Sequence, residues 1–241
     1  MKEGKKKPDL FRLKQFSISH HASTLKVGTD SLLLGAWATS GKRMLDVGTG
    51  CGIVALMATQ QGDDSSQTDA IDIHEQSVQE ANANFKNSPW SHRIKAFHCS
   101  IQDFNPGYSY DVILCNPPFF TAGNPSDKHP RAAARHSLTL DIEGLVTHAR
   151  RLLGGEGSLI TILPFDQKEN IDNVCSAHGF SFHAGLWFKS KEDKPWSRIL
   201  TKYVIGKKPE YPIIQHLTHY TENMKWTEAY KALTGDFHVM L

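Results

Sequence analysis

Residues 44–52 read Met44-Leu45-Asp46-Val47-Gly48-Thr49-Gly50-Cys51-Gly52, and this stretch decides the fold. The apolar run from Met44 to Val47 predicts a buried strand, and three alternate glycines follow it directly. Glycine allows a tight turn and lets a ligand approach the backbone closely. Apolar residues at helical spacing come next, at Ile53, Leu56 and Met57. The stretch therefore predicts a strand, a turn and a helix that open an α/β fold with a ligand site at one sheet edge.

Strands and helices alternate outward from this stretch. The expected strands are Met44 to Val47, Ala70 to Ile73, Ile94 to Cys99, Asp111 to Cys115, Ser158 to Leu163, His183 to Phe188 and Ile199 to Ile205. Helical patterns fill three gaps: Ile53 to Met57, Val78 to Phe85 and Ile142 to Leu152. The connection from Lys189 to Arg198 is too short for a helical crossover, so the last two strands should form an antiparallel hairpin. We expect a Rossmann-like α/β fold with a seven-stranded, mostly parallel sheet and helices on both faces.

Composition limits the class of protein. The chain has 241 residues, 39% of them hydrophobic, which suits one α/β domain. Its Lys-rich start does not resemble a signal peptide, and the apolar run from Leu32 to Ala38 is too short to span a bilayer. The four cysteines form no Cys-x-x-Cys pair, and the histidines show no ligand spacing. We expect a cytoplasmic protein with no membrane segment and no metal.

Positive charge gathers in two segments although the net charge is only +2. Residues 1–14 carry six basic against two acidic side chains, and residues 189–208 carry seven against two. Such patches suit phosphate contacts, with a solvated terminus and a charged hairpin as the alternative. We divide the chain into a basic arm and first helix (1–40) belonging to the same domain, a core (41–208) and a C-terminal extension (209–241). The first helix should begin near Thr29 or Asp30, either of which can cap it.

The glycine spacing indicates a nucleoside-bearing ligand other than a dinucleotide. Gly48, Gly50 and Gly52 follow the pattern Gly-x-Gly-x-Gly, whereas a dinucleotide fingerprint needs its third glycine at Ile53. Asp72 closes the second strand, where an acidic residue can bind ribose hydroxyls. A tight turn uses glycine for steric reasons alone, which is the alternative interpretation.

The fourth strand ends in Asn116-Pro117-Pro118-Phe119, which suits methyl transfer to a planar amino group. Such a nitrogen is a poor nucleophile because its lone pair is delocalised into the ring. The side-chain carbonyl of Asn116 and the backbone carbonyl of Pro117 can accept its hydrogens and direct the lone pair. Pro118 stiffens the loop, and Phe119 offers a stacking surface for a flipped base. The run is also a turn signal, but its position after the glycine loop favours a catalytic site.

The run Leu45 to Gly48 resembles the first motif of class I S-adenosylmethionine-dependent methyltransferases. The resemblance implies the class I methyltransferase sheet and S-adenosyl-L-methionine as cofactor, with Asp46 near its amino-acid end. It places Gly48, Thr49, Gly50, Gly52, Asp72 and Asn116 around the cofactor. Relatives carry an acidic residue where this chain has Ser100, so Ser100 or Asp103 would contact the adenine, with Ile101 covering its face. The alternative is that Ser100 only caps a turn.

From Phe16 to Lys207 the chain resembles the bacterial tRNA methyltransferases that form N6-methyladenosine at position 37 of a valine tRNA. The segment from Lys26 to Trp37 adds to the resemblance, which places Gly28, Thr29 and Asp30 near the methionine end of the cofactor. tRNA is the implied partner. The residues we expect at the RNA are Lys5, Lys6, Lys7, Phe119, Phe120, Arg131, Arg135, His136, Lys191 and Arg198.

Three other functions stay open. Ribosomal RNA guanine-N2 methyltransferases share Asn-Pro-Pro-Phe but usually continue with His, where this chain has Phe120. Release-factor glutamine methyltransferases typically end the motif in Tyr, and their substrate has no phosphates for the basic segments to bind. A non-catalytic RNA-binding protein on the same fold would need neither Asn116 nor the glycine loop. The sequence does not indicate an oligomeric state.

Overall fold

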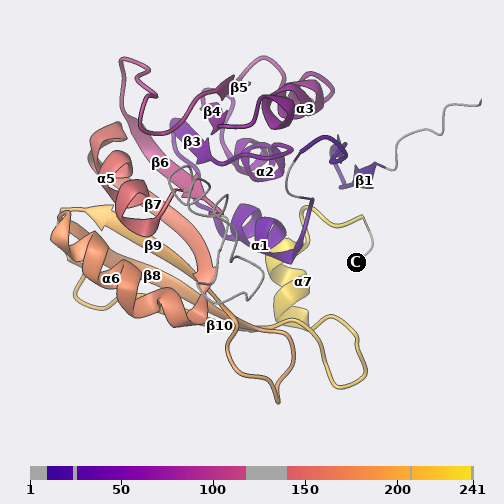
Figure 1. Ribbon diagram of the computed structural model, residues 1–241. Helices are drawn as coiled ribbons and strands as arrows, with labels where there is room; N and C mark the ends of the chain where they lie inside the picture. Colours follow the sequence, from indigo (N-terminus) through magenta and orange to yellow (C-terminus); the bar gives the residue numbers. More distant parts are fainter. Residues whose placement is uncertain (1–9, 24–25, 118–139, 207, 240–241) are drawn as a thin grey trace, which may run out of the picture.

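A computed structural model describes residues 10–23, 26–117, 140–206 and 208–239 of the chain (Figure 1). Within these residues, eight strands form one sheet in the order β10-β8-β9-β7-β6-β3-β4-β5, and β1 and β2 form a small separate sheet. The strands are β1 (Phe11–Arg12), β2 (Ser17–Ile18), β3 (Arg43–Val47), β4 (Gln67–Asp72), β5 (Ile94–His98), β6 (Tyr110–Cys115), β7 (Leu153–Pro164), β8 (Phe180–Lys189), β9 (Arg198–Ile205) and β10 (Ile213–Thr218). The α-helices are α1 (Thr29–Trp37), α2 (Ile53–Gln61), α3 (Glu75–Lys86), α5 (Ile142–Leu152), α6 (Lys168–Ala177) and α7 (Glu228–Thr234).

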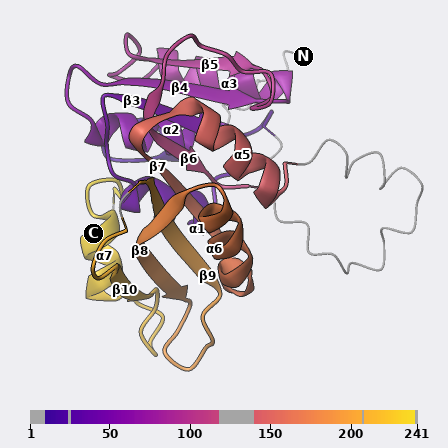
Figure 2. The same ribbon diagram turned by 90° about the vertical axis from the view of Figure 1, so that its left-hand side faces the viewer.

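Helices cover both faces of the large sheet because its central strands are apolar on both sides. Successive residues of a strand point to opposite faces. Met44 therefore packs into a cluster with α1, α2, α3 and α7, whereas Leu45 packs into a second cluster with α5 and α6. Figures 1 and 2 show these two helical layers on either side of the strands.

The expected fold class is confirmed, including the antiparallel hairpin. Strand β9 runs antiparallel to both β7 and β8, while β3, β4, β5, β6 and β7 pair in parallel. The sheet has one more strand than expected, because β10 from the C-terminal segment pairs in parallel with β8. Helix α6 was also missed, although Ile171 and Cys175 lie four residues apart on its buried face.

The expected cap of the first helix was wrong in detail. Helix α1 does begin at Thr29, but its N-cap is Gly28, and neither Thr29 nor Asp30 supplies a capping side chain. The Ser31 hydroxyl instead accepts a hydrogen bond from the Gly28 amide (3.2 Å) and donates one to the Gly28 carbonyl (2.9 Å). The Asp30 carboxylate is therefore free to pair elsewhere.

One edge of the large sheet collects the chemistry-bearing segments. Strands β3, β4, β5, β6, β7, β8 and β10 all point the same way, so their carboxyl ends lie at a common edge. Antiparallel β9 begins at this edge with Arg198. Ligands of open α/β sheets bind at such carboxyl edges. Within the described residues no helix is long and apolar enough to cross a membrane, and no cluster of three His, Cys, Asp or Glu side chains is arranged to hold a metal.

Candidate active site at the carboxyl edge of the sheet

The glycine loop after β3 adopts a backbone that favours glycine at three positions. Gly48, Gly50 and Gly52 have φ values of 72°, 54° and 87°. A side chain at Gly52 would overlap the ring of Phe85, whereas one at Gly48 would meet no atom of the described residues within 4 Å. Gly52 is therefore required by packing between α2 and α3. Gly48 is exposed and faces open space among the described residues.

The Asp46 carboxyl group lies inside the protein beneath this loop. It is 1% exposed and accepts a hydrogen bond of 2.6 Å from the Thr49 hydroxyl. Burial raises the pKa of Asp46 to about 7, with a smaller contribution from the negative charge of Asp72, while the Thr49 hydrogen bond opposes the shift. Through Thr49 the Asp46 carboxyl group contacts the loop, which it holds in shape.

Asp72 ties the end of β4 to the glycine loop. One carboxylate oxygen accepts from the Gly50 amide and the other from the His74 amide, each at 2.9 Å. The amides of Gly48 and Thr49 donate to the Ile71 carbonyl at 2.9 and 3.0 Å. Each Asp72 oxygen still has capacity for a further donor. The two segments thus form one rigid unit with acceptor capacity left over.

The turn after β5 is held by Ser100. Its hydroxyl donates to the Asp103 carboxylate at 2.6 Å and accepts from the Asp103 amide at 3.2 Å. Ile101 is 3% exposed, and its carbonyl accepts from Arg151 at 2.8 Å. Ser100 and Asp103, the two alternatives for the adenine contact, therefore lie together in one turn.

Asn116 and Pro117 follow β6, which is the neighbour of β3 in the sheet. Asn116 is half-buried and Pro117 is buried. Both line a cavity of about 580 Å³. The same cavity is lined by Gly28, Thr29 and Asp30 of the α1 N-terminus and by Arg198. The structure thus brings Asn116 together with residues that lie roughly eighty positions away on either side in the sequence.

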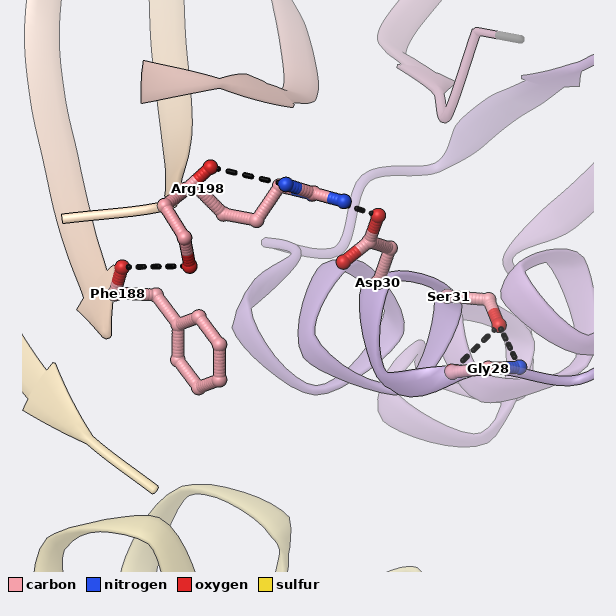
Figure 3. Close-up of polar contacts among 6 residues, drawn as sticks. Gly28, Asp30, Ser31, Phe188 and Arg198 are labelled. Atoms are coloured by element: carbon pink, nitrogen blue, oxygen red, sulfur yellow. Dashed lines mark hydrogen bonds and ion pairs between the residues drawn. The ribbon is translucent and has the colours of Figure 1, made fainter. Parts of the chain in front are cut away.

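An ion pair crosses one side of this cavity (Figure 3). Arg198 Nε donates to Asp30 Oδ2 at 2.8 Å, and Arg198 Nη1 donates to the Ser197 carbonyl at 2.9 Å. Both side chains are partly exposed. The pair joins the N-terminus of α1 to the start of β9, so the Arg198 charge is already balanced by Asp30.

Sequence reasoning missed about half of the cavity wall. The additional lining residues are Lys26, Ser31, Phe188, Ser190, Ser197, His219 and Tyr220. Lys26 precedes α1 and Ser31 lies in its first turn, both within the stretch that adds to the resemblance. The other five come from the β8–β9 hairpin and from the turn after β10. No local motif marks these five, because only the order of strands in the sheet brings them together.

A second missed feature ties the N-terminal segment to the glycine loop. The buried Glu80 carboxylate accepts hydrogen bonds from the Ser19 hydroxyl and from the amides of residues 21–23. Burial raises the pKa of Glu80, but these hydrogen bonds outweigh it and lower the pKa overall. Asn84 Nδ2 donates to the carbonyls of Ser19 and Cys51, both at 2.8 Å. Helix α3 therefore fixes the segment beside the loop.

Several of the expected site residues lie outside the described part of the chain. These are Lys5, Lys6, Lys7, Pro118, Phe119, Phe120, Arg131, Arg135 and His136. Lys191 is described and lies in the β8–β9 hairpin, two residues beyond the end of β8. It is not among the residues that line the cavity.

Comparison with known proteins shows the family and the fold of the chain. Residues 19–170 match the family model described as "Methyltransferase small domain". A crystal structure described as a predicted O-methyltransferase from Agrobacterium tumefaciens superposes with a TM-score of 0.67 at 14% identity, covering 86% of this chain and 96% of the other. The N-methyltransferase NodS from Bradyrhizobium japonicum, in complex with S-adenosyl-L-homocysteine, gives a TM-score of 0.52 at 10% identity over 73% of this chain and 84% of its own. These two structures show the same fold.

Curated relatives match over nearly the whole chain. A tRNA1(Val) (adenine(37)-N6)-methyltransferase from Parabacteroides distasonis is 33% identical over 96% of this chain and 98% of its own length. One of the same name from Pectobacterium carotovorum is 34% identical over 97% of this chain and 95% of its own. With a matching domain, a matching fold and this degree of identity at full length, the chain belongs to the tRNA1(Val) (adenine(37)-N6)-methyltransferase family.

Proposed function

We propose that the chain transfers a methyl group from S-adenosyl-L-methionine to the exocyclic N6 of an adenine in tRNA, at position 37 of tRNA1(Val). The observation that carries this proposal is the position of Asn116 and Pro117. They lie between the glycine loop and a cavity at one sheet edge. The names of the full-length relatives supply the identity of the RNA.

The residues at β3 and β4 fit the cofactor. The open space over Gly48 leaves room for its methionine part, and the spare acceptor capacity of Asp72 suits the ribose hydroxyls. Thr49, Gly50 and Gly52 shape this seat, which Asp46 supports from beneath. Ser100 and Ile101 would border the adenine, and Gly28, Thr29 and Asp30 would lie near the methionine end. When bound, the cofactor supplies a methyl group activated by its positively charged sulfur.

Asn116 and Pro117 act on the substrate amine. The Asn116 side-chain carbonyl and the Pro117 backbone carbonyl accept the two amino hydrogens, which takes the nitrogen lone pair out of conjugation with the ring. Pro117 is buried and its φ is fixed by its ring, so the two acceptors are held in place before substrate binds. As the new N–C bond forms, the bond between the methyl carbon and the cofactor sulfur would break, and the methylated amine would then lose a proton to water. No side chain with a shifted pKa is required.

The other expected contacts complete the proposal. Phe119 and Phe120 would stack on the flipped adenine, and Pro118 would stiffen the loop that carries them. Lys5, Lys6, Lys7, Lys191, Arg131, Arg135 and His136 would contact phosphates. Arg198 would contact the RNA at the cavity wall while it remains paired with Asp30.

The test is a substrate comparison. The protein is incubated with methyl-labelled S-adenosylmethionine and, separately, with unmodified total tRNA, ribosomal RNA and a release factor. Nucleosides and peptides are then identified by mass spectrometry. The proposal predicts N6-methyladenosine in tRNA alone. N2-methylguanosine in either RNA, or label only in protein, would overturn it.

A further inference from the structure

A stack of three aromatic rings lies at the edge of the cavity, two from the turn after β10 and one from α7. His219 lies against Tyr220 with ring centroids 3.8 Å apart and planes at 23°. The centroid of the His219 ring also lies 4.0 Å from that of Tyr230 in α7, with an angle of 32° between the ring planes. His219 and Tyr230 are 7% and 2% exposed, whereas Tyr220 is half-buried. The stack is thus buried at one end and ends in Tyr220 at the cavity.

Backbone hydrogen bonds hold this stack in place. The amides of His219 and Tyr220 donate to the carbonyls of Lys189 and Ser190, each at 3.0 Å, which prolongs the pairing of β10 with β8. The amide of Thr227 donates to the His219 carbonyl at 3.0 Å. Burial lowers the pKa of His219 to about 4, with a smaller contribution from His238, so the ring is neutral at physiological pH. A neutral, fixed ring pair makes a preformed platform for a further flat ring.

The platform lies too far from Asn116 to hold the reacting base itself. Strand β10 is four positions from β6 in the sheet order, which at the usual spacing separates the two backbones by about 19 Å. Asn116 nevertheless lines the same cavity as Tyr220. One nucleotide at Asn116 leaves the Tyr220 end of the cavity for its neighbour in the RNA strand.

The charges around the cavity suit an RNA backbone. Lys26 is exposed and lines the cavity, and it forms no ion pair with any residue that the structure describes. Arg198 is held on the same wall by Asp30. Aromatic platforms flanked by basic side chains are the usual means of binding single-stranded nucleic acid.

We infer that Tyr220, backed by His219 and Tyr230, is the stacking platform for the nucleotide adjacent to the methylated adenine. This inference rests on the proposed function for its substrate, and it assigns the C-terminal segment a share in RNA recognition. Tyr220 contacts the RNA without touching the reacting atoms. Its loss should raise the KM for RNA and leave the rate at saturating RNA nearly unchanged.

The test uses an unmodified anticodon stem-loop of the valine tRNA with 2-aminopurine next to the target adenine, on its 5′ or its 3′ side. Fluorescence of 2-aminopurine is quenched by stacking on an aromatic ring. The variants are Tyr220→Leu, Tyr220→Phe and, as the matched control, Tyr211→Leu, which changes a tyrosine that is 79% exposed and outside the cavity. Binding of S-adenosylhomocysteine is measured for each.

One labelled position should be quenched by the wild type, by Tyr220→Phe and by Tyr211→Leu, but not by Tyr220→Leu. The KM for RNA should rise about tenfold in Tyr220→Leu alone, with S-adenosylhomocysteine affinity unchanged. Equal behaviour of Tyr220→Leu and Tyr211→Leu would overturn the inference. If Tyr220→Leu does not fold, 5-iodouridine is placed at the same RNA position and photocrosslinked to the wild type. The inference requires the crosslink to map to Tyr220, and a crosslink to another residue would overturn it.

These outcomes separate the inference from the proposed function. Quenching that depends on Tyr220, in a protein that methylates no adenine, supports the platform and refutes the proposed reaction. Methylation of adenine by a Tyr220→Leu protein with wild-type KM refutes the platform alone. A wild type that does not bind the stem-loop refutes both.

Discussion

On one side of Asn116, the carboxyl edge is built from a single short stretch, Gly48 to Gly52, and the adjacent Asp72. On the other side, the cavity wall is assembled from segments spread between Lys26 and Tyr220. In the first region, backbone amides of the loop donate hydrogen bonds to the Ile71 carbonyl and the Asp72 carboxylate. The second depends on strand order, on an ion pair and on a ring stack. A universal cofactor needs only a local motif, whereas a particular RNA needs surfaces that the whole fold must assemble.

Asn116 lies at the boundary between the two regions, and replacing it should have the largest effect. Asn116→Ala removes one of two acceptors for the amine, so we expect kcat to fall by about 10²–10³-fold. Affinity for S-adenosylhomocysteine, measured calorimetrically, should change less than about twofold because the glycine loop is intact. A large loss of that affinity would place Asn116 in the cofactor region and break the comparison.

Asp46 tests how the cofactor region is held from beneath. Because the folded protein raises the pKa of Asp46 from 3.8 to about 7, the folded state binds this proton more tightly than the unfolded chain. Its contribution to the free energy of unfolding therefore falls as pH rises from about 4 to about 7, by at most about 4 kcal/mol. The side chain of the Asp46→Asn variant does not titrate, so its free energy of unfolding should lack this pH dependence. Its stability relative to the wild type should therefore increase as pH rises. Free energies of unfolding from denaturant titrations, plotted against pH, should converge or cross for the two proteins. Parallel plots would rule out the buried carboxyl group as described.

Gly48 separates the cofactor role of the loop from its role in folding. Gly48→Ala places a methyl group where the cofactor should approach, and Gly179→Ala is its matched control. Both glycines have positive φ, 72° and 77°, and open space around them. Each change should cost about 1 kcal/mol of stability. Only Gly48→Ala should weaken S-adenosylhomocysteine binding, by about tenfold. Equal affinities for the two variants would remove Gly48 from the cofactor seat.

Asp30 should give the smallest effect and shows to which region the start of α1 belongs. The Asp30–Arg198 pair is partly exposed, so Asp30→Asn should change the free energy of unfolding by less than about 1 kcal/mol, and less at high salt. The variant frees a positive charge at the cavity, so affinity for the stem-loop should rise slightly. Affinity for S-adenosylhomocysteine should fall slightly, because the proposed function places Asp30 near the methionine end of the cofactor. Unchanged cofactor affinity would assign the α1 N-terminus to the RNA region alone.

The cofactor region was predictable because its signals are local. Gly48 to Gly52 and Asn116 each follow an apolar strand, Asp72 ends one, and parallel strands bring their carboxyl ends together. Helix α6 was missed although its apolar residues have helical spacing. Strand β10 gave a weak signal, since Ile213 and Ile214 are exposed at the sheet edge and lack the alternation of a half-buried strand.

About half of the cavity wall was not predictable from the chain alone. Phe188, Ser197 and Tyr220 belong to no motif, and they meet only because β8, β9 and β10 are neighbours in the sheet. Arg198 was expected to bind RNA from its charge, but nothing in the sequence indicated its ion pair with Asp30, 168 residues away. Long-range pairing of this kind depends on topology, which local patterns do not encode.

The measurement that tests the division of the carboxyl edge most directly is a calorimetric titration of two ligands into three proteins. S-adenosylhomocysteine and the anticodon stem-loop are each titrated into the wild type, Gly48→Ala and Tyr220→Leu. We predict that Gly48→Ala loses affinity for S-adenosylhomocysteine alone and that Tyr220→Leu loses affinity for the RNA alone. Loss of the same ligand by both variants, or of both ligands by either, would contradict the account.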